Sequence, residues 1–234
     1  MDKYFVAIQK GENRKQLLEK TLNMMKDKIP NISGRIIIKP NFLSANNLLA
    51  STTPETLEIV VCFFRKLFPK NEIYIAEGAH VSKEYIQKHN INRLAEKYKA
   101  KLFSIDYDEK NWDFVEFEDL VGEKCKARVS NTYMTSEYIV SLTVPKTHAN
   151  IGLSLSMKNL VGILHPDDRP KFHGLTDNVP QNIKNKYKSR LYDRDDKLGF
   201  YCMKLRNILP ITNKTAKNLQ KGSEIVRKNL YHLY

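Results

Sequence analysis

Short, mostly apolar runs constrain this chain more than any other feature. Residues 36–38 are three consecutive isoleucines, and similar runs stand at 73–76 and 138–144. A strand that is apolar on both faces must be covered on both, which is typical of parallel sheets and unusual in antiparallel ones. These runs therefore predict a parallel sheet inside an α/β domain.

Helical patterns alternate with these strands. Apolar residues recur at helical spacing over 13–28, and Thr53 followed by proline is typical of a helix start. A further helix is predicted over 82–98, before a strand at 101–106, and an additional strand is predicted at 4–8. This alternation predicts right-handed crossovers and a mostly parallel, doubly wound sheet.

Two later regions break the alternation. Residues 108–135 contain short alternating pieces and predict a small antiparallel insertion, whereas the apolar stretch 149–164 predicts a helix. After residue 176 the sequence becomes irregular, helical in character and basic. We therefore expect an α/β domain over 1–176 and a basic helical C-terminal segment over 177–234.

The positive charge of the chain is concentrated near its C-terminus. The formal net charge is +13, and residues 184–234 hold thirteen basic residues against four acidic ones. Five tyrosines in the same stretch are available for base stacking, so nucleic acid or another polyanion is a possible partner of residues 184–234. A solvated helical face is the alternative.

Cysteine usage and hydropathy limit the cofactors and the compartment. Cys62, Cys125 and Cys202 include no Cys-x-x-Cys pair, so neither a disulfide framework nor an iron–sulfur cluster is expected. No run of eighteen apolar residues is present, and the N-terminus does not resemble a signal peptide. These features predict a cytoplasmic protein without a membrane segment.

Polar residues follow three of the predicted strands. In open α/β sheets, ligands bind beyond the carboxyl ends of the strands. Each of the six polar residues that follow these strands could be a surface side chain or a turn cap. If the strands are parallel neighbours, however, all six side chains would face one crevice, where the lysines would neutralise a small anionic ligand. The residues concerned are Lys39, Asn41, Glu77, His80, Lys146 and His148.

A lysine interrupts the apolar stretch that follows. Residues 150–162 are apolar on nearly every face, yet they contain Lys158 and Asn159. Burial of a lysine lowers its pKa unless the charge is paired, although the amine can also extend to the surface. The flanking serines and glycines favour close approach of a ligand, so Lys158 and Asn159 are candidates for cofactor binding.

The next loop is rich in possible metal ligands. Residues 165–173 include two histidines and two aspartates, which predicts a divalent-metal site with one imidazole ligand or, alternatively, a polar surface loop. The chain has no Gly-x-Gly-x-x-Gly, Walker, nucleophile-elbow or His-Glu-x-x-His motif. The common nucleotide-binding, esterase and zinc-protease classes are therefore not favoured.

On these motifs the sequence resembles the domain of unknown function 362 family. The family usually continues into a second half with Asp-Gly and Gly-Pro turns, and neither dipeptide occurs here. Many members also carry ferredoxin-type cysteines, which this chain lacks. We therefore expect a fragment, or a shortened member whose site a partner completes. The matching segments are Ile38–Asn41, Thr52–Glu55, Glu77–Gly78, Val144–His148 and Ser156–Gly162.

A more distant similarity is to the nickel-pincer lactate racemase family. That resemblance implies an acid/base pair of His80 and His148, a covalent nucleotide anchor at Lys158 and a nickel ligand at His173. It implies a metal- or nucleotide-dependent isomerase or oxidoreductase, with racemase- or epimerase-like chemistry on a small anionic hydroxy acid. A catalytically degenerate partner subunit is an alternative function, and the chain is expected to act as a homo-oligomer or with a partner subunit.

Overall fold

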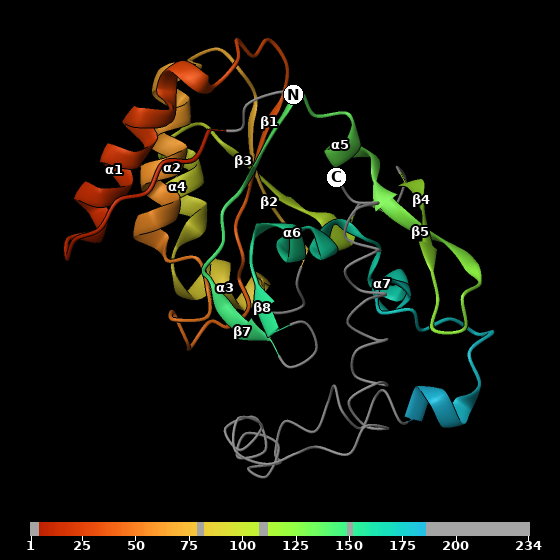
Figure 1. Ribbon diagram of the computed structural model, residues 1–234. Coiled ribbons are helices and arrows are strands. Elements are labelled where there is room, and N and C mark those ends of the chain that lie inside the picture. Colours follow the sequence, from red (N-terminus) through yellow and green to blue (C-terminus); the bar gives the residue numbers. More distant parts are fainter. Residues whose placement is uncertain (1–4, 79–81, 108–111, 149–151, 186–234) are drawn as a thin grey trace, which may run out of the picture. The chain divides into compact units, whose positions relative to one another are not determined.

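The computed structural model describes residues 5–78, 82–107, 112–148 and 152–185 (Figure 1). The chain divides into two compact units. Unit 1 contains Met1–Trp112 and Ser130–Val144, and unit 2 contains Asp113–Val129 and Pro145–Tyr234.

A four-stranded parallel sheet forms the centre of unit 1. Its strands lie in the order β3-β2-β1-β6, and β1 pairs in parallel with both of its neighbours. The isoleucines of β1 are fully buried, as expected for an inner strand of a parallel sheet. The predicted α/β class and parallel sheet are confirmed. The strands are β1 (Ile36–Lys39), β2 (Ile73–Glu77), β3 (Lys101–Ser104) and β6 (Tyr138–Ser141).

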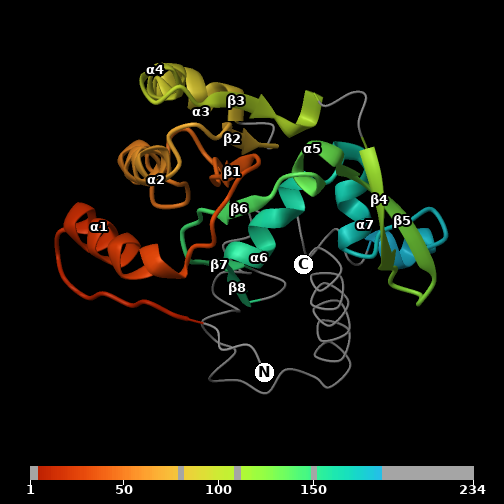
Figure 2. The same cartoon turned by 90° about the horizontal axis from the view of Figure 1, so that it is seen from above.

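Helices cover one face of this sheet in unit 1. In two perpendicular views, α1, α2 and α4 lie on the same side of the strands (Figure 1 and Figure 2). The shared core contains Ile36 and Ile38 of β1, with Leu57 and Phe64 of α2. The helices are α1 (Arg14–Met25), α2 (Pro54–Leu67), α3 (Ser82–Lys88), α4 (Ile91–Lys97) and the single turn α5 (Asn131–Met134).

A doubly wound sheet requires helices on both faces. The described helices α1 to α4 share one core with alternate residues of the strands, so double winding stays a prediction. Residues 186–234 lie outside the described residues. The division at residue 176 and the basic helical C-terminal segment also stay predictions.

Two sequence predictions in unit 1 were wrong in detail. The expected strand at 4–8 is not formed over 5–8, where Val6 is 74% and Ile8 is 81% exposed and no neighbouring strand pairs with them. The expected helix over 82–98 is divided because Asn90 adopts a left-handed backbone with φ of 52°. Asparagine tolerates this conformation better than most residues, so it ends one helix and begins the next.

Unit 2 is built from small elements. Strands β4 (Trp112–Glu118) and β5 (Lys124–Ser130) pair as a two-stranded hairpin, which confirms the expected small antiparallel insertion. A second hairpin joins β7 (Lys146–His148) to β8 (Gly152–Ser154) in antiparallel register. Short helical turns follow: α6 (Ser156–Asn159), η3 (Leu160–Ile163), η4 (Pro166–Asp168) and α7 (Arg169–Phe172).

The predicted helix over 149–164 is wrong at residues 152–154, and residues 149–151 lie outside the described residues. Residues 152–154 form β8, and helical structure begins only at Ser156. The order Gly152-Leu153-Ser154-Leu155 alternates small or polar residues with apolar ones, a period that suits a strand. Across the described ranges, no helix is long and apolar enough to cross a membrane.

Candidate functional site

A buried ion pair lies at the carboxyl ends of β1 and β2. The Nζ atom of Lys39 is 3.0 Å from Oε2 of Glu77, and the two side chains are 0% and 5% exposed. The other carboxylate oxygen of Glu77 accepts the Gly78 amide at 3.2 Å. A buried charge of this kind is tolerated only when it is paired and hydrogen-bonded. The positive charge of Lys39 is therefore compensated within unit 1.

The strand order changes direction at β1, with β2 and β3 on one side and β6 on the other. Such switch points are the usual ligand sites of open α/β sheets. Here Thr52 links the residues that follow β1 to the residue that follows β6. Its Oγ1 accepts the amide of Asn41 at 2.9 Å and donates to the carbonyl oxygen of Leu142 at 2.8 Å. Its amide donates to the Asn41 carbonyl oxygen at 2.8 Å. Thr52 was not singled out from the sequence.

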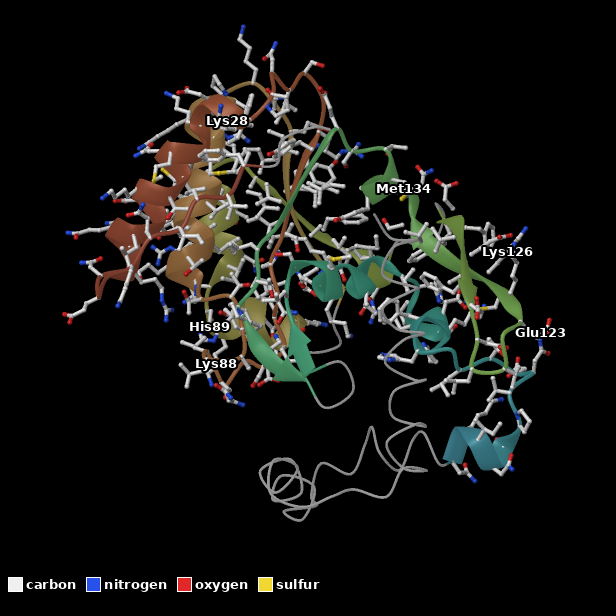
Figure 3. All side chains as sticks on the ribbon, in the orientation of Figure 1. Lys28, Lys88, His89, Glu123, Lys126 and Met134 are labelled. Carbon is white, nitrogen blue, oxygen red and sulfur yellow. The ribbon has the colours of Figure 1, made fainter. Side chains whose placement is uncertain are left out.

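Helix α3 holds the loop that carries Thr52. The Tyr85 hydroxyl donates to the Thr52 carbonyl oxygen at 2.6 Å, and its ring stacks on Phe42 with centroids 4.2 Å apart. His89, labelled beside Lys88 in Figure 3, lies 3.0 Å from the Ala45 carbonyl oxygen through a ring nitrogen. These contacts explain why Tyr85 is fully buried, and burial raises its pKa to about 12. The loop is thus a packed part of the fold.

Lys158 of α6 lies in a different environment in unit 2. It is half-buried, and its Nζ atom is 5.4 Å from the centroid of the Phe172 ring in α7. Burial and the nearby charge of Lys146 lower the pKa of Lys158 to about 8. Among the described residues, Lys158 forms no ion pair with a carboxylate. Lys158 is therefore a partly desolvated amine with a cationic neighbour.

The β7–β8 hairpin and the helix α6 that follows it position these groups. Lys146 is opposite Ser154 in the β7–β8 register, and α6 begins two residues after Ser154. Phe172 is fully buried, and its ring contacts Phe117 of β4 edge-on at 5.8 Å between centroids. We refer to Lys146, Lys158 and Phe172 as the lysine site. The aromatic ring of the lysine site is packed in the core of unit 2, and its two charged groups are both positive.

Two further predicted residues lie beside the lysine site. Asn159 follows Lys158 and is buried. His173 packs edge-to-face on Phe172, with centroids 5.3 Å apart and an interplanar angle of 86°. The structure thus brings Lys146, Lys158, Asn159 and His173 into one neighbourhood of unit 2. Their assigned roles in binding a cofactor or metal stay predictions.

The carboxylates of the 165–173 loop make structural ion pairs. Asp168 is buried, and its Oδ2 accepts the Arg128 Nε at 2.7 Å and the Arg128 amide at 2.8 Å. Its Oδ1 is 2.9 Å from Nζ of Lys171. These hydrogen bonds hold the pKa of Asp168 well below its usual range, against the opposing effect of burial. Asp168 thereby fastens β5 to η4 and α7, a role that the sequence did not indicate.

The donor set of the described chain does not fit a metal held by several side chains. Within the ranges described, no group of three or more histidine, cysteine, aspartate or glutamate side chains could hold a metal ion. Asp168 is committed to Arg128 and Lys171, and His165 lies 3.6 Å from Asp167. A single imidazole contribution from His173 stays a prediction, and we derive no step through a metal.

The remaining predicted residues divide between the units. Lys39 and Asn41 belong to unit 1, whereas Lys146 and Lys158 belong to unit 2, so a single crevice stays a prediction. His80 lies outside the described residues. His148 contributes its backbone to β7, and its side chain is likewise outside the description.

Comparison with known proteins identifies a family. A family model described as "Domain of unknown function (DUF362)" matches residues 36–221, beginning at the first residue of β1. Searches of curated proteins and of solved structures gave no match. The similarity to lactate racemases therefore rests on short motifs alone. The family model spans most of the length of the chain, and the chain therefore belongs to the DUF362 family.

Proposed function

We propose that unit 2 binds a small anionic ligand at the lysine site. The observation that supports this most directly is Lys158, a half-buried ammonium group without a carboxylate partner among the described residues. Burial of an uncompensated charge is unfavourable. A bound carboxylate or phosphate would provide the missing negative charge.

The second lysine adds to this preference. Burial is the main cause of the lowered pKa of Lys158, and repulsion between its ammonium group and that of Lys146 lowers the pKa further. An anion that contacts both would convert this repulsion into two charge-assisted interactions. Phe172 is fully buried, so the two ammonium groups would form the contacts with the ligand. Small carboxylates and phosphates are the ligands that such contacts favour.

Binding at this site is coupled to protonation. Only the charged form of Lys158 attracts the anion, and the free amine has a pKa of about 8. The affinity is expected to be constant below pH 7 and to fall about tenfold per pH unit above pH 8. Near pH 8, binding raises the pKa of Lys158 and takes up part of a proton. The half-buried His173 and Lys146 are the other titratable groups beside the site.

The reaction is proposed from the motif order alone. Racemase- or epimerase-like chemistry on a hydroxy acid would use His80 and His148 to transfer protons, and a bound nucleotide cofactor would supply the hydride acceptor. Conversion of one lactate enantiomer into the other, by protein purified from its own host, tests this reaction. Loss of conversion in His148→Ala, with the fold retained, is the expected result.

Native mass spectrometry and calorimetry test the ligand site itself. Protein from its own host is examined for a copurified acid or cofactor, and lactate, acetate and phosphate are titrated between pH 6 and pH 9.5. Lys158→Gln is expected to weaken binding at least tenfold and to abolish proton uptake. Lys126→Gln is the matched control, because Lys126 is an exposed lysine of unit 2 (Figure 3). Equal binding by both variants would contradict the proposal.

A further inference from the structure

We propose that Lys158 is a nucleophile that forms an imine with a carbonyl ligand carrying an acid group, such as a 2-oxo acid. The inference rests on the proposed anion site and names the substrate class that the site would take. Two geometric observations support it: the Lys158 amine lies 5.4 Å from the centroid of the Phe172 ring, and it has no carboxylate partner among the described residues.

Two other lysines, the buried Lys39 and the half-buried Lys171, show why the missing carboxylate matters. Lys39 is paired with Glu77 at 3.0 Å, and Lys171 is paired with Asp168 at 2.9 Å. A neighbouring carboxylate favours the ammonium form, which has no lone pair and cannot attack a carbonyl carbon. Lys158 lacks this stabilisation and has a cationic neighbour, the arrangement that activates lysine nucleophiles.

The population of neutral amine follows from these surroundings. With a pKa of about 8, roughly a quarter of Lys158 is neutral at pH 7.5. An ordinary exposed lysine is neutral in about one molecule in a thousand at that pH. The face of Phe172 excludes water from one side of the amine, which also disfavours hydrolysis of the imine.

The chemical step balances without an oxidant or reductant. The lone pair of Nζ attacks the carbonyl carbon, a carbon–nitrogen bond forms, and the oxygen takes up a proton to give a carbinolamine. Loss of the hydroxyl group as water then leaves the carbon–nitrogen double bond. The acid group of the ligand would be held by Lys146. The net reaction is amine plus carbonyl compound giving imine plus water.

Reductive trapping tests this step on the full-length protein. Glyoxylate or pyruvate is added with cyanoborohydride at pH 7.5, and the modified residue is located by peptide mass spectrometry. Adduct formation at Lys158 is expected to be at least about tenfold faster than at exposed Lys126, given the larger neutral fraction. Equal labelling of Lys158 and Lys126 would overturn the inference.

Two variants distinguish imine formation at Lys158 from anion binding at the lysine site. Lys158→Arg keeps the positive charge and should still bind lactate in calorimetry, yet it should give no adduct at position 158. Lys146→Gln should raise the pKa of Lys158 and remove the group that holds the acid of the ligand, so trapping at pH 7.5 should fall several-fold, and pH 9.5 should restore only the part due to the pKa. Because Lys146→Gln leaves Lys158 in place, it provides a test even if the arginine variant does not fold.

The outcomes distinguish the two proposals. Lactate binding without an adduct at Lys158 overturns the imine and leaves the anion site standing. Failure to bind either lactate or a 2-oxo acid overturns both. An adduct at Lys158 that is lost in Lys158→Arg, while lactate still binds, supports both.

Discussion

The carboxyl end of the unit 1 sheet and the lysine site of unit 2 hold two lysines with the same expected role but opposite surroundings. Lys39 is fully buried and paired with Glu77, whereas Lys158 is half-buried over Phe172 without a carboxylate partner among the described residues. The comparison shows that burial alone does not mark a ligand site. The presence or absence of an internal counter-charge decides which lysine can take an external anion.

Removal of Glu77 should have the largest effect on stability. Glu77→Gln leaves Lys39 buried beside a neutral group, and we expect a loss of about 3–5 kcal/mol in urea unfolding. Glu72→Gln is the matched control, because Glu72 pairs with Lys101 at the surface and little change is expected. The double variant Lys39→Met, Glu77→Leu should recover most of the loss. Equal effects of Glu77→Gln and Glu72→Gln would refute the structural role of the pair.

Asp168 provides the corresponding test in unit 2. Asp168→Asn weakens the interactions with Arg128 and Lys171, and we expect a loss of about 2–4 kcal/mol in the unfolding of unit 2. Asp167→Asn should change little, because Asp167 is largely exposed.

The Asp168 carboxylate should make the stability of unit 2 depend on pH. Its folded pKa is lowered, so its contribution is present above the unfolded value of about 4 and is lost as the pH falls through the folded value. Asp168→Asn should flatten the decline of stability below pH 4. A decline as steep as that of the native protein would show that other carboxylates dominate.

Lys158→Met should change the stability of its unit in the opposite direction from Lys39→Met. Replacement of an unpaired, partly buried ammonium by an apolar side chain is expected to stabilise unit 2 by about 1–3 kcal/mol at pH 7, whereas Lys39→Met should destabilise unit 1. The pKa of Lys158 is about 8 in the folded state and 10.5 in the unfolded state. At pH values between these two, the unfolded state therefore binds more protons. Native stability should therefore rise with pH from about 8 to 10.5, and Lys158→Met should lack this rise.

Thr52→Val should give the smallest of these effects. The variant loses the hydroxyl that links Asn41 and Leu142, which should cost about 1–2 kcal/mol in thermal or urea unfolding. Thr135→Val, at an exposed position, is expected to change little. If Thr52→Val also leaves stability unchanged, the two strand ends are held together by their backbone pairing alone.

Much of the fold was predictable from local patterns. The isoleucines of residues 36–38 predicted a doubly buried parallel strand, and Thr53 predicted the start of α2, where its side chain accepts the Thr56 amide. The strand expected at 4–8 failed because β-propensity without a pairing partner does not make a strand. The helix expected over 149–164 failed at residues 152–154, because their alternation of small or polar with apolar residues suits a strand.

The candidate site was predictable only as a set of residues. The sequence by itself determined the apolar strands, the helix starts and the lysines that stand near strand ends, because these depend on short-range periodicity and residue chemistry. Tertiary structure alone decided that Glu77, 38 positions away, neutralises Lys39, and that Arg128 and Lys171 occupy Asp168. It also decided that Lys158 lies over the Phe172 ring and feels the charge of Lys146, with no carboxylate partner among the residues that the structure describes. The counter-charge of a buried group comes from distant segments, so no local pattern specifies it.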